Sequence, residues 1–178
     1  NFFSFKVILM LDKLLIKQIK KLYPSFEVND QSVKKIGGLT SENFCINLKT
    51  GESLMLKVYT SISPVDIEKL GHICQNNFGA KIISSFPQGR IEKWLGGNPM
   101  KQKDIKGNLL KKIAKKICKF HNTLGLIHGD LNLNNIIMVQ KKNVRLIDFE
   151  YSRCINRFSD RADDISDFFT SCMYDYMS

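Results

Sequence analysis

The sequence predicts an α+β protein of two lobes, with a small antiparallel sheet in the first lobe and mainly helices in the second. Short apolar segments, separated by glycine-rich and polar turns, recur up to about residue 95 and predict five strands and one main helix. A long helical pattern and a short hairpin follow them. Because Gly96-Gly97-Asn98-Pro99 breaks the chain between these halves, we expect lobes at residues 10–97 and 98–178.

The first lobe opens with a helix and continues as strands. Apolar residues at helical spacing between Leu11 and Leu22 predict an amphipathic helix, which Pro24 ends. A second helix is expected from Ser63-Pro64 to about Asn77, because a hydroxyl cap followed by proline is typical of a helix start. Strands joined by turns are expected at residues 33–36, 44–48, 53–59, 81–86 and 90–95.

Lys57 lies inside the apolar third strand, and Glu68 lies in the second turn of the helix that follows. A lysine that is buried in a sheet needs an anionic partner, and Glu68 is the candidate for it. Alternatively, Lys57 points to solvent on the alternating face and Glu68 is an ordinary exposed helix acid. Spacing alone leaves both interpretations open.

The second lobe is expected to contain two helices. The first runs from about Gln102 to Leu124, where Gly125 ends it, and its lysines at positions 111, 112, 115, 116 and 119 form a stripe opposite an apolar one. The net charge is +10, but the lysines are spread along the chain, so we interpret the stripe as a solvated face and expect no nucleic acid partner. Nucleic-acid binding by the stripe is the weaker alternative. The final helix opens at about Arg161 and has four large apolar residues roughly on one side, Phe168, Phe169, Met173 and Tyr176.

Cysteine usage and the first residues bear on location. The five cysteines are scattered and never form a Cys-x-x-Cys pair, which is typical of reduced thiols inside the cell. Residues 1–9 are apolar but short, and no segment approaches the length of a membrane span. Met10 stands just before the first helix, so residues 1–9 are interpreted as upstream or fragment sequence. We expect a cytoplasmic protein without stable membrane insertion.

Three polar residues around a predicted hairpin carry the chemistry. Asp130 and Asn135 lie five positions apart in a polar loop, and Asp148 closes the second of two short strands at 136–139 and 144–147. Because the two strands run out and back over equal lengths, Asn135 and Asp148 are expected to end near one another. Two oxygen ligands for a hard cation beside a free carboxylate are what Mg²⁺-dependent phosphoryl transfer requires.

In this order the segments resemble the protein-kinase-like fold, and more narrowly the choline/ethanolamine kinase family. The resemblance covers residues 12–178, and the Asp-Phe-Glu-Tyr-Ser segment is its most specific part. It implies an N-lobe with an antiparallel five-stranded sheet and a C-lobe that lacks the family's last helices. The motifs that carry it are Gly37-Gly38-Leu39-Thr40-Ser41-Glu42-Asn43-Phe44, Leu56-Lys57-Val58-Tyr59, Phe86-Pro87-Gln88-Gly89-Arg90-Ile91-Glu92, His128-x-Asp130-(four residues)-Asn135 and Ile147-Asp148-Phe149-Glu150-Tyr151-Ser152.

The resemblance implies ATP and Mg²⁺ as cofactors and a role for each matching residue. Asp130 would act as the base toward the alcohol, and Asn135 and Asp148 would hold Mg²⁺. His128 and Asp164 would support the catalytic loop. Lys57, where the family usually has arginine, would contact the α/β phosphates and be held by Glu68. The remaining nucleotide-binding residues would be those of the phosphate loop and the adenine hinge, Gly38, Leu39, Thr40, Ser41, Glu92 and Trp94.

For the substrate, the resemblance implies choline or ethanolamine, phosphorylated in the first step of phosphatidylcholine or phosphatidylethanolamine synthesis. A cationic amine site would draw on Asp130 together with Glu150, Tyr151, Asp167 and Tyr174. The sequence departs from the family at Ser171, where a substrate-facing Glu is usual. A phosphotransferase for another amino alcohol or an aminoglycoside, and an inactive kinase-like ATP-binding protein, remain alternatives. A homodimer also stays open.

Overall fold

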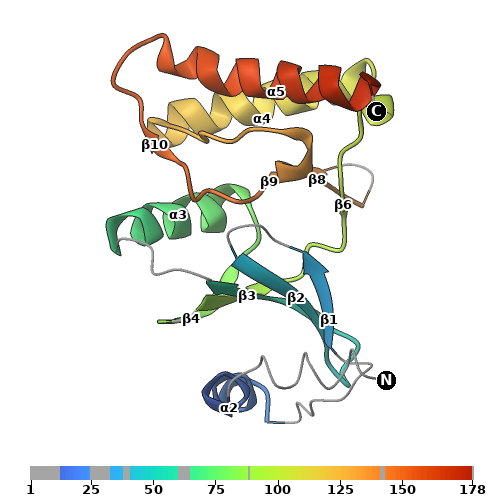
Figure 1. The fold of residues 1–178 in the computed structure, drawn as a ribbon, viewed down its shortest axis with the longest axis vertical. Helices are drawn as coiled ribbons and strands as arrows, with labels where there is room; N and C mark the ends of the chain where they lie inside the picture. The colour runs from blue at the N-terminus through green and yellow to red at the C-terminus, as the bar shows by residue number, and fades with distance from the viewer. Residues whose placement is uncertain are drawn as a thin grey trace. The chain divides into compact units, whose positions relative to one another are not determined.

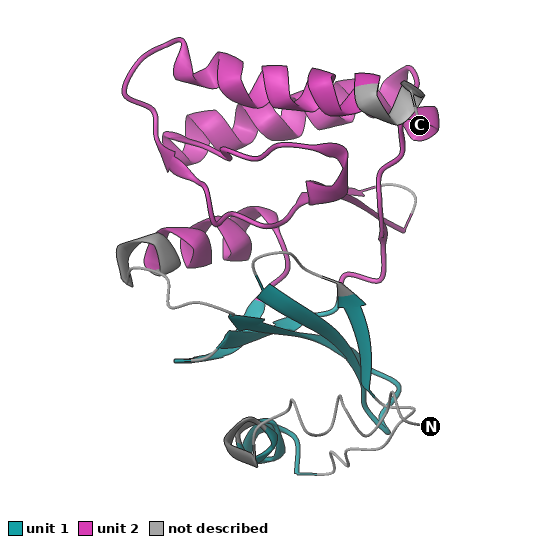
Figure 2. Ribbon diagram, in the orientation of Figure 1, with its two compact units in different colours: residues 1–62, 82–94 teal, residues 63–81, 95–178 magenta. Residues whose placement is uncertain are grey.

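The computed structural model of the chain describes residues 13–24, 33–37, 41–59, 65–87, 89–140 and 143–177. The expectation that residues 1–9 are upstream sequence therefore lies outside the described residues. The chain forms two compact units (Figures 1 and 2), the first made of residues 1–62 and 82–94 and the second of residues 63–81 and 95–178. No described helix is long and apolar enough to cross a membrane.

The first unit is built on a five-stranded antiparallel sheet, as predicted. Its strand order is β1-β2-β3-β5-β4, so β5 lies between β3 and β4. Helix α2 (Lys13–Leu22) precedes the sheet and belongs to the same unit. The strands are β1 (Val33–Gly37), β2 (Ser41–Asn47), β3 (Ser53–Tyr59), β4 (Ile82–Phe86) and β5 (Gly89–Lys93).

Apolar and polar residues alternate along the strands, and this pattern explains the core of the first unit. Phe44 and Ile46 of β2 lie opposite Leu56 and Leu54 of β3, so their side chains stack on one face of the sheet. All four are nearly inaccessible to solvent, and Ile19 of α2 belongs to the same buried cluster. The helix therefore covers the apolar face that the alternation creates. Strand β2 begins at Ser41, earlier than the expected residue 44, because Ser41 still pairs with Tyr59.

The second unit is mainly helical and contains two small sheets, β6-β8-β9 and β7-β10. The long helix begins at Asn108 and not at Gln102, because a 3₁₀ turn η1 (Gln102–Asp104) and Gly107, with φ +45°, precede it. It ends as predicted at Gly125 in a left-handed cap. The elements are α3 (Val65–Phe78), β6 (Asn98–Pro99), α4 (Asn108–Leu124), β7 (Leu126–Ile127), η2 (Leu133–Asn135), β8 (Ile136–Val139), β9 (Asn143–Leu146), β10 (Arg153–Cys154) and α5 (Asp160–Met177).

Helix α3 belongs to the second unit, which differs from the expected lobe boundary at residues 97 and 98. Its residues Cys74 and Phe78 are buried in the same cluster as Phe120 and Phe149. The rings of Phe78 and Phe120 meet edge to face with centroids 5.1 Å apart, and those of Phe120 and Phe149 stack at 5.6 Å. The apolar side of α3 therefore packs in the second unit, although α3 lies between strands of the first unit in the sequence.

One expectation about α5 is wrong. Phe168 and Phe169 were expected roughly on one side of the helix together with Met173, but successive residues in a helix point about 100° apart. Phe168 is buried in the core of the second unit, whereas Phe169 and Met173 are 55% and 68% exposed. Among the α5 side chains that the structure describes, Phe168 and, in part, Cys172 belong to the core, and they are four positions apart.

Candidate active site

The predicted hairpin is present, with β8 and β9 as its strands, although β9 begins at Asn143, one residue earlier than expected, and ends at Leu146. Ile136 pairs with Leu146, and Val139 pairs with Asn143. One step beyond the ladder, the amide of Ile147 donates to the carbonyl oxygen of Asn135 at 3.0 Å. This bond fixes Asn135 beside the backbone that leads directly into Asp148, so the hairpin brings the two ends together as the sequence predicted.

Asp148 has a backbone conformation that few non-glycine residues adopt, with φ +66°. Its neighbour Phe149 is 2% exposed and packs into the core of the second unit. The left-handed residue turns the chain sharply after β9, so that Phe149 enters the core while Asp148 stays half-buried. Aspartate tolerates this conformation better than most residues, and strain of this kind is concentrated at functional sites.

The loop that carries Asp130 is held by asparagine side chains. Asn132 Nδ2 donates to Asp130 Oδ1 at 2.9 Å, and Asn135 Nδ2 donates to Asp130 Oδ2 at 2.8 Å. Asn135 Nδ2 also donates to the backbone oxygen of Asp130 at 2.8 Å. Asn132 in addition accepts from the amide of Asn134 and so caps the 3₁₀ turn η2. The carboxylate is therefore oriented by neutral amide donors.

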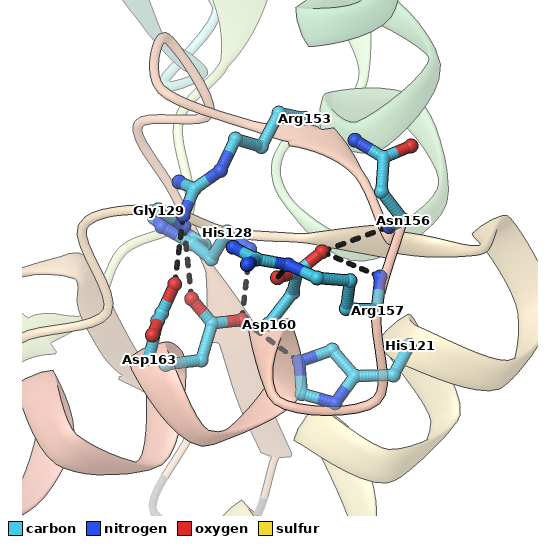
Figure 3. A network of polar contacts seen from close by, with 9 residues as sticks. His121, His128, Gly129, Arg153, Asn156, Arg157, Asp160 and Asp163 are labelled. Atoms are coloured by element: carbon cyan, nitrogen blue, oxygen red, sulfur yellow. Dashed lines mark hydrogen bonds and ion pairs between the residues drawn. The ribbon is translucent and has the colours of Figure 1, made fainter.

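Asp164 of α5 forms hydrogen bonds to the start of this loop, and its side chain is completely buried. It accepts hydrogen bonds from His121 Nε2 at 2.8 Å and from the backbone amides of His128 at 2.8 Å and Gly129 at 2.9 Å (Figure 3). Burial alone would raise the pKa of the Asp164 carboxyl, but these hydrogen bonds outweigh it and the pKa lies below its usual value. Asp164 thus stays ionised while it holds the start of the loop.

Gly129 is required at its position for two reasons. Its φ is +80°, and a Cβ at this residue would lie 2.3 Å from the carbonyl oxygen of Tyr151. Ser152, next to Tyr151, donates from its hydroxyl to the carbonyl oxygen of His128 at 3.2 Å. The segment after Phe149 therefore lies tightly against the start of the catalytic loop.

His128 has the contacts of a structural brace. Its ring is fully buried, Nε2 lies 2.8 Å from the carbonyl oxygen of Ile147, and the ring packs 4.9 Å from that of Phe149. Burial lowers the pKa of His128, although Asp164 and the Ile147 carbonyl favour the charged form. The ring is therefore neutral, and because a carbonyl only accepts, we assign its proton to Nε2. Nδ1 is buried and has no hydrogen-bond partner within the described part of the chain.

In the first unit, Lys57 of β3 is 5% exposed, which excludes the solvent-facing interpretation. It lies opposite Asn43 of β2 and Arg90 of β5. Its proposed partner Glu68 lies in α3, but the Glu68 side chain is outside the described residues, as are Gly38, Leu39 and Thr40 of the expected phosphate loop. Ser41 of that loop is described: it is buried at the start of β2.

The expected hinge residues lie at the end of β5. Glu92 is 2% exposed, and its Oε1 accepts from Arg90 Nε, two positions earlier on the same face of the strand. Arg90 also lies 3.3 Å from the Tyr59 hydroxyl, and although burial opposes its charge, Glu92 and Tyr59 raise its pKa. Trp94 donates its amide to the Ser53 carbonyl at 3.2 Å. The role of Arg90 was not predicted, but the Arg-x-Glu spacing within a strand was a usable signal.

Apart from Asp130, the residues expected to bind the substrate either follow the hairpin or lie in α5. Glu150 is half-buried and Tyr151 is 56% exposed, whereas the Tyr174 side chain lies outside the described residues. Burial raises the pKa of Asp167, and the nearby charges of Asp164, Asp130 and Asp163 raise it further. Negative charge therefore accumulates around the loop and the first half of α5.

Ser171 connects α5 to the catalytic loop, a function that sequence reasoning missed. Its hydroxyl accepts from the amide of Leu133 at 3.2 Å and donates to the carbonyl oxygen of Phe168 at 2.8 Å. The sequence marked this position only as a departure from the family pattern. The structure shows that a short hydroxyl side chain here links helix and loop directly.

Asn135 and Asp148 fit a magnesium ion better than a transition metal. No group of three or more His, Cys, Asp or Glu able to hold a metal is present in the part of the chain that the structure describes. Mg²⁺ instead takes one or two protein oxygens together with phosphates and waters. The side-chain nitrogen of Asn135 donates to Asp130, so its side-chain oxygen is the atom that would act as the ligand.

Comparison with known proteins places this site in a family. A family model described as Choline/ethanolamine kinase matches residues 33–126 and 112–178. The chain is 26% identical over 137 residues to a choline kinase of Schizosaccharomyces pombe (strain 972 / ATCC 24843). This match covers 71% of this chain and 30% of that protein. The chain thus spans less than a third of the length of this curated relative.

Solved structures share the fold. An ethanolamine kinase of Plasmodium vivax matches with a TM-score of 0.64 and 19% identity, over 89% of this chain and 66% of that one. A Mycobacterium tuberculosis protein in complex with erythromycin matches with a TM-score of 0.59 and 17% identity, over 85% of this chain and 52% of that one. These likenesses confirm the predicted α+β kinase-like fold. Because the family model matches most of the sequence, including the catalytic loop and the hairpin, the chain belongs to the choline/ethanolamine kinase family.

Proposed function

We propose that the protein transfers the γ-phosphoryl group of ATP to the hydroxyl of choline or ethanolamine. The observation that carries this proposal is the arrangement of Asp130 and Asn135 in a braced loop whose hairpin delivers Asp148 to the same end. A carboxylate and two oxygen ligands in this arrangement suit phosphoryl transfer, where catalysis is mostly positioning and charge stabilisation. The family membership supports the same reaction.

In this mechanism Asp130 orients the alcohol and accepts its proton on a carboxylate oxygen as the bond to phosphorus forms. Asn132 and Asn135 hold both carboxylate oxygens in place without neutralising the charge. Asn135 and Asp148 would bind Mg²⁺, which supplies charge neutralisation on the phosphates. Lys57, held by Glu68, would contact the α/β phosphates, and the residues of the phosphate loop and hinge would bind the rest of the nucleotide.

A cationic substrate fits the charge around the loop. Burial raises the pKa of Asp167, and repulsion by the charges of Asp164, Asp130 and Asp163 raises it further. An ammonium group bound beside these carboxylates would reduce that repulsion. The exposed ring of Tyr151 could contact the same group through its face. The acids therefore favour an amino alcohol over a neutral or anionic acceptor.

The product would enter phospholipid synthesis, and a cytoplasmic location fits the cysteines. All five are free thiols: Cys118 and Cys154 are exposed, Cys45 and Cys172 are partly exposed, and Cys74 is buried. Free thiols of this kind persist in a reducing compartment.

Phosphoryl transfer can be tested directly with purified protein, Mg-ATP and choline, ethanolamine or an aminoglycoside as acceptor. We expect phosphocholine or phosphoethanolamine as product, and we expect Asp130→Asn to lower kcat by about 10²- to 10⁴-fold. Asp104→Asn is the matched control, because Asp104 is exposed and its carboxylate accepts from the backbone amide of Lys101 at 3.2 Å, away from the carboxylates proposed to favour the substrate.

The acceptor that reacts decides between the alternatives. An aminoglycoside or another amino alcohol as the preferred acceptor would change the substrate assignment and leave the phosphotransferase assignment intact. No product with any acceptor, combined with stabilisation of the fold by ATP, would show an ATP-binding protein without turnover. Full activity of Asp130→Asn would contradict the role of Asp130 as base.

A further inference from the structure

A basic groove lies in the second unit, between α4 and β9, and the proposed phosphoryl transfer does not use it. Its volume is about 580 Å³, which is within the range of small-ligand sites. The polar residues that line it are Lys112, Lys115, Lys116, Lys119, Asn143 and Arg145, here called the basic groove. Its described lining contains no acidic side chain.

The four lysines share one face of α4, since their positions follow the i, i+3, i+4, i+7 spacing of a helix. Helix α4 contains no Asp or Glu, so it offers none of the opposite charges that usually alternate with lysines on a solvated helix. Arg145 comes from a different element, β9. A solvated helix face explains the lysines on α4. It does not explain why Arg145 of β9 lines the same groove.

Within the groove, neighbouring positive charges act on Lys116. This residue is half-buried, and its Nζ lies 5.7 Å from the ring centroid of Phe78. Burial lowers the pKa of Lys116, and the neighbouring positive charges of Arg145 and Lys119 lower it further. Lys115, Lys119 and Arg145 have no acidic partner among the described residues. A bound anion would compensate all of these charges at once.

The groove and the proposed catalytic residues lie at different parts of the hairpin. Asn143 begins β9 next to the turn and pairs with Val139. Asn135 stands at the opposite end of the hairpin, where its carbonyl accepts from Ile147. The groove is therefore a second feature of this unit, and binding there does not depend on the proposed phosphotransferase activity.

We propose that the basic groove binds an anion that carries several closely spaced phosphate groups, either a free polyphosphorylated molecule or the headgroup of a phosphorylated inositol lipid. Several cations converging on one concavity match several phosphates better than a single one. A nucleic acid is disfavoured, because the described lining contains no aromatic side chain on which a base could stack.

The test measures binding of inositol hexakisphosphate and pyrophosphate by calorimetry, and binding to phosphatidylcholine vesicles with and without phosphatidylinositol bisphosphate by co-sedimentation. The groove variant Lys115→Ala/Lys119→Ala is compared with the matched variant Lys103→Ala/Lys111→Ala, which removes two exposed lysines that do not line the groove. We expect about tenfold weaker binding for the groove variant only, and weaker binding at high salt.

Each outcome has a defined meaning. Tighter binding of the soluble phosphates than of the vesicles identifies a free ligand, and the reverse identifies a lipid headgroup; both support the proposal. Absence of binding to every probe overturns it, as does equal weakening by both double variants. Tighter binding of single-stranded RNA than of inositol hexakisphosphate would replace it with nucleic-acid binding. Because both variants leave Asp130, Asn135 and Asp148 unchanged, phosphoryl transfer measured in parallel separates failure of this proposal from failure of the proposed function.

Discussion

Single residues determine how firmly the catalytic loop is fixed. Asp164 receives one imidazole and two backbone donors while fully buried, and Gly129 allows the backbone to approach Tyr151 closely. His128 connects the same loop to the end of β9 through Ile147. Three residues with no expected contact to the substrate therefore place Asp130 and Asp148.

Replacing Gly129 tests this close approach. We expect Gly129→Ala to lower the free energy of unfolding by about 3 kcal/mol, because positive φ and a backbone clash combine there. The new Cβ would lie 2.3 Å from the Tyr151 oxygen. Gly125→Ala is the control: its φ is +65°, but nothing lies within 4 Å of its Cβ. It should cost about 1 kcal/mol for the left-handed backbone alone. Urea unfolding measures both, and equal losses would show that the contact with Tyr151 does not constrain the loop.

Sequence reasoning reached the residues with distinctive chemistry and missed those whose roles depend on packing. An acid and an amide in a polar loop are common, but the pattern of Asp130 and Asn135 followed by the hairpin to Asp148 is distinctive when it comes in order after the Lys57 strand and the glycine-rich segment. The Ser171 link to Leu133 could not be predicted, because the two residues are far apart in sequence and either could have faced solvent. Whether Lys57 is exposed or buried was likewise undecided by spacing, and the structure buries it.

At the level of elements, local sequence patterns predicted which helices and strands form better than they predicted where each one begins or packs. The β8–β9 hairpin follows from equal apolar segments around a polar turn, but its register differs by one residue from the prediction, because β9 begins at Asn143 and Ile136 pairs with Leu146. Helix α4 begins six residues later than expected, because the glycine at 107 interrupts a continuous apolar stripe. Helix α3 was expected in the first lobe, but its buried residues pack in the second unit. Such packing depends on contacts between segments distant in sequence.

Helix α5 offers a matched pair of phenylalanines for testing its packing. Phe168 is 4% exposed and lies in the core, whereas its neighbour Phe169 is 55% exposed. We expect Phe168→Ala to cost about 3 to 5 kcal/mol, the usual effect of a cavity in a core. Phe169→Ala should cost about 1 kcal/mol or less, since it loses mainly the ring contact with Phe168. Chemical denaturation measures the difference. Similar costs for both would mean that the exposed side of α5 is covered in solution.

At the scale of the whole molecule, the two compact units divide the proposed work. The first contains the sheet with Lys57 and Glu92, and the second contains the loop and hairpin with Asp130, Asn135 and Asp148. The sequence placed the boundary at residues 97 and 98, whereas α3, and with it Glu68, belongs to the second unit. The predicted phosphate loop is a glycine-rich segment whose sequence does not define one backbone conformation, and three of its residues lie outside the described part.

Nucleotide binding by the whole molecule provides a test that does not require the acceptor to be known. A ligand that binds only the folded state stabilises it by about 2.7 kcal/mol at a hundredfold excess over its Kd. We expect Mg-ATP to raise Tm for wild type and for Asp130→Asn, because Asp130 is proposed to act on the alcohol and not to bind the metal. Asp148→Asn should lose the part of the shift that requires Mg²⁺ and keep the part given by ATP with a chelator, because the substitution removes one anionic ligand.

Asp104→Asn serves again as the control, since Asp104 is exposed and its carboxylate accepts from the backbone amide of Lys101. Its Mg-ATP shift should equal that of wild type. If Asp130→Asn and Asp148→Asn lost the shift equally, the separation between base and metal ligand would be wrong. Because Asn135 donates to Asp130, such a result would mean that the charge of Asp130 is needed to orient the Asn135 side-chain oxygen toward the ion. The loop and the hairpin would then act as one metal-binding unit rather than as a base next to a metal site.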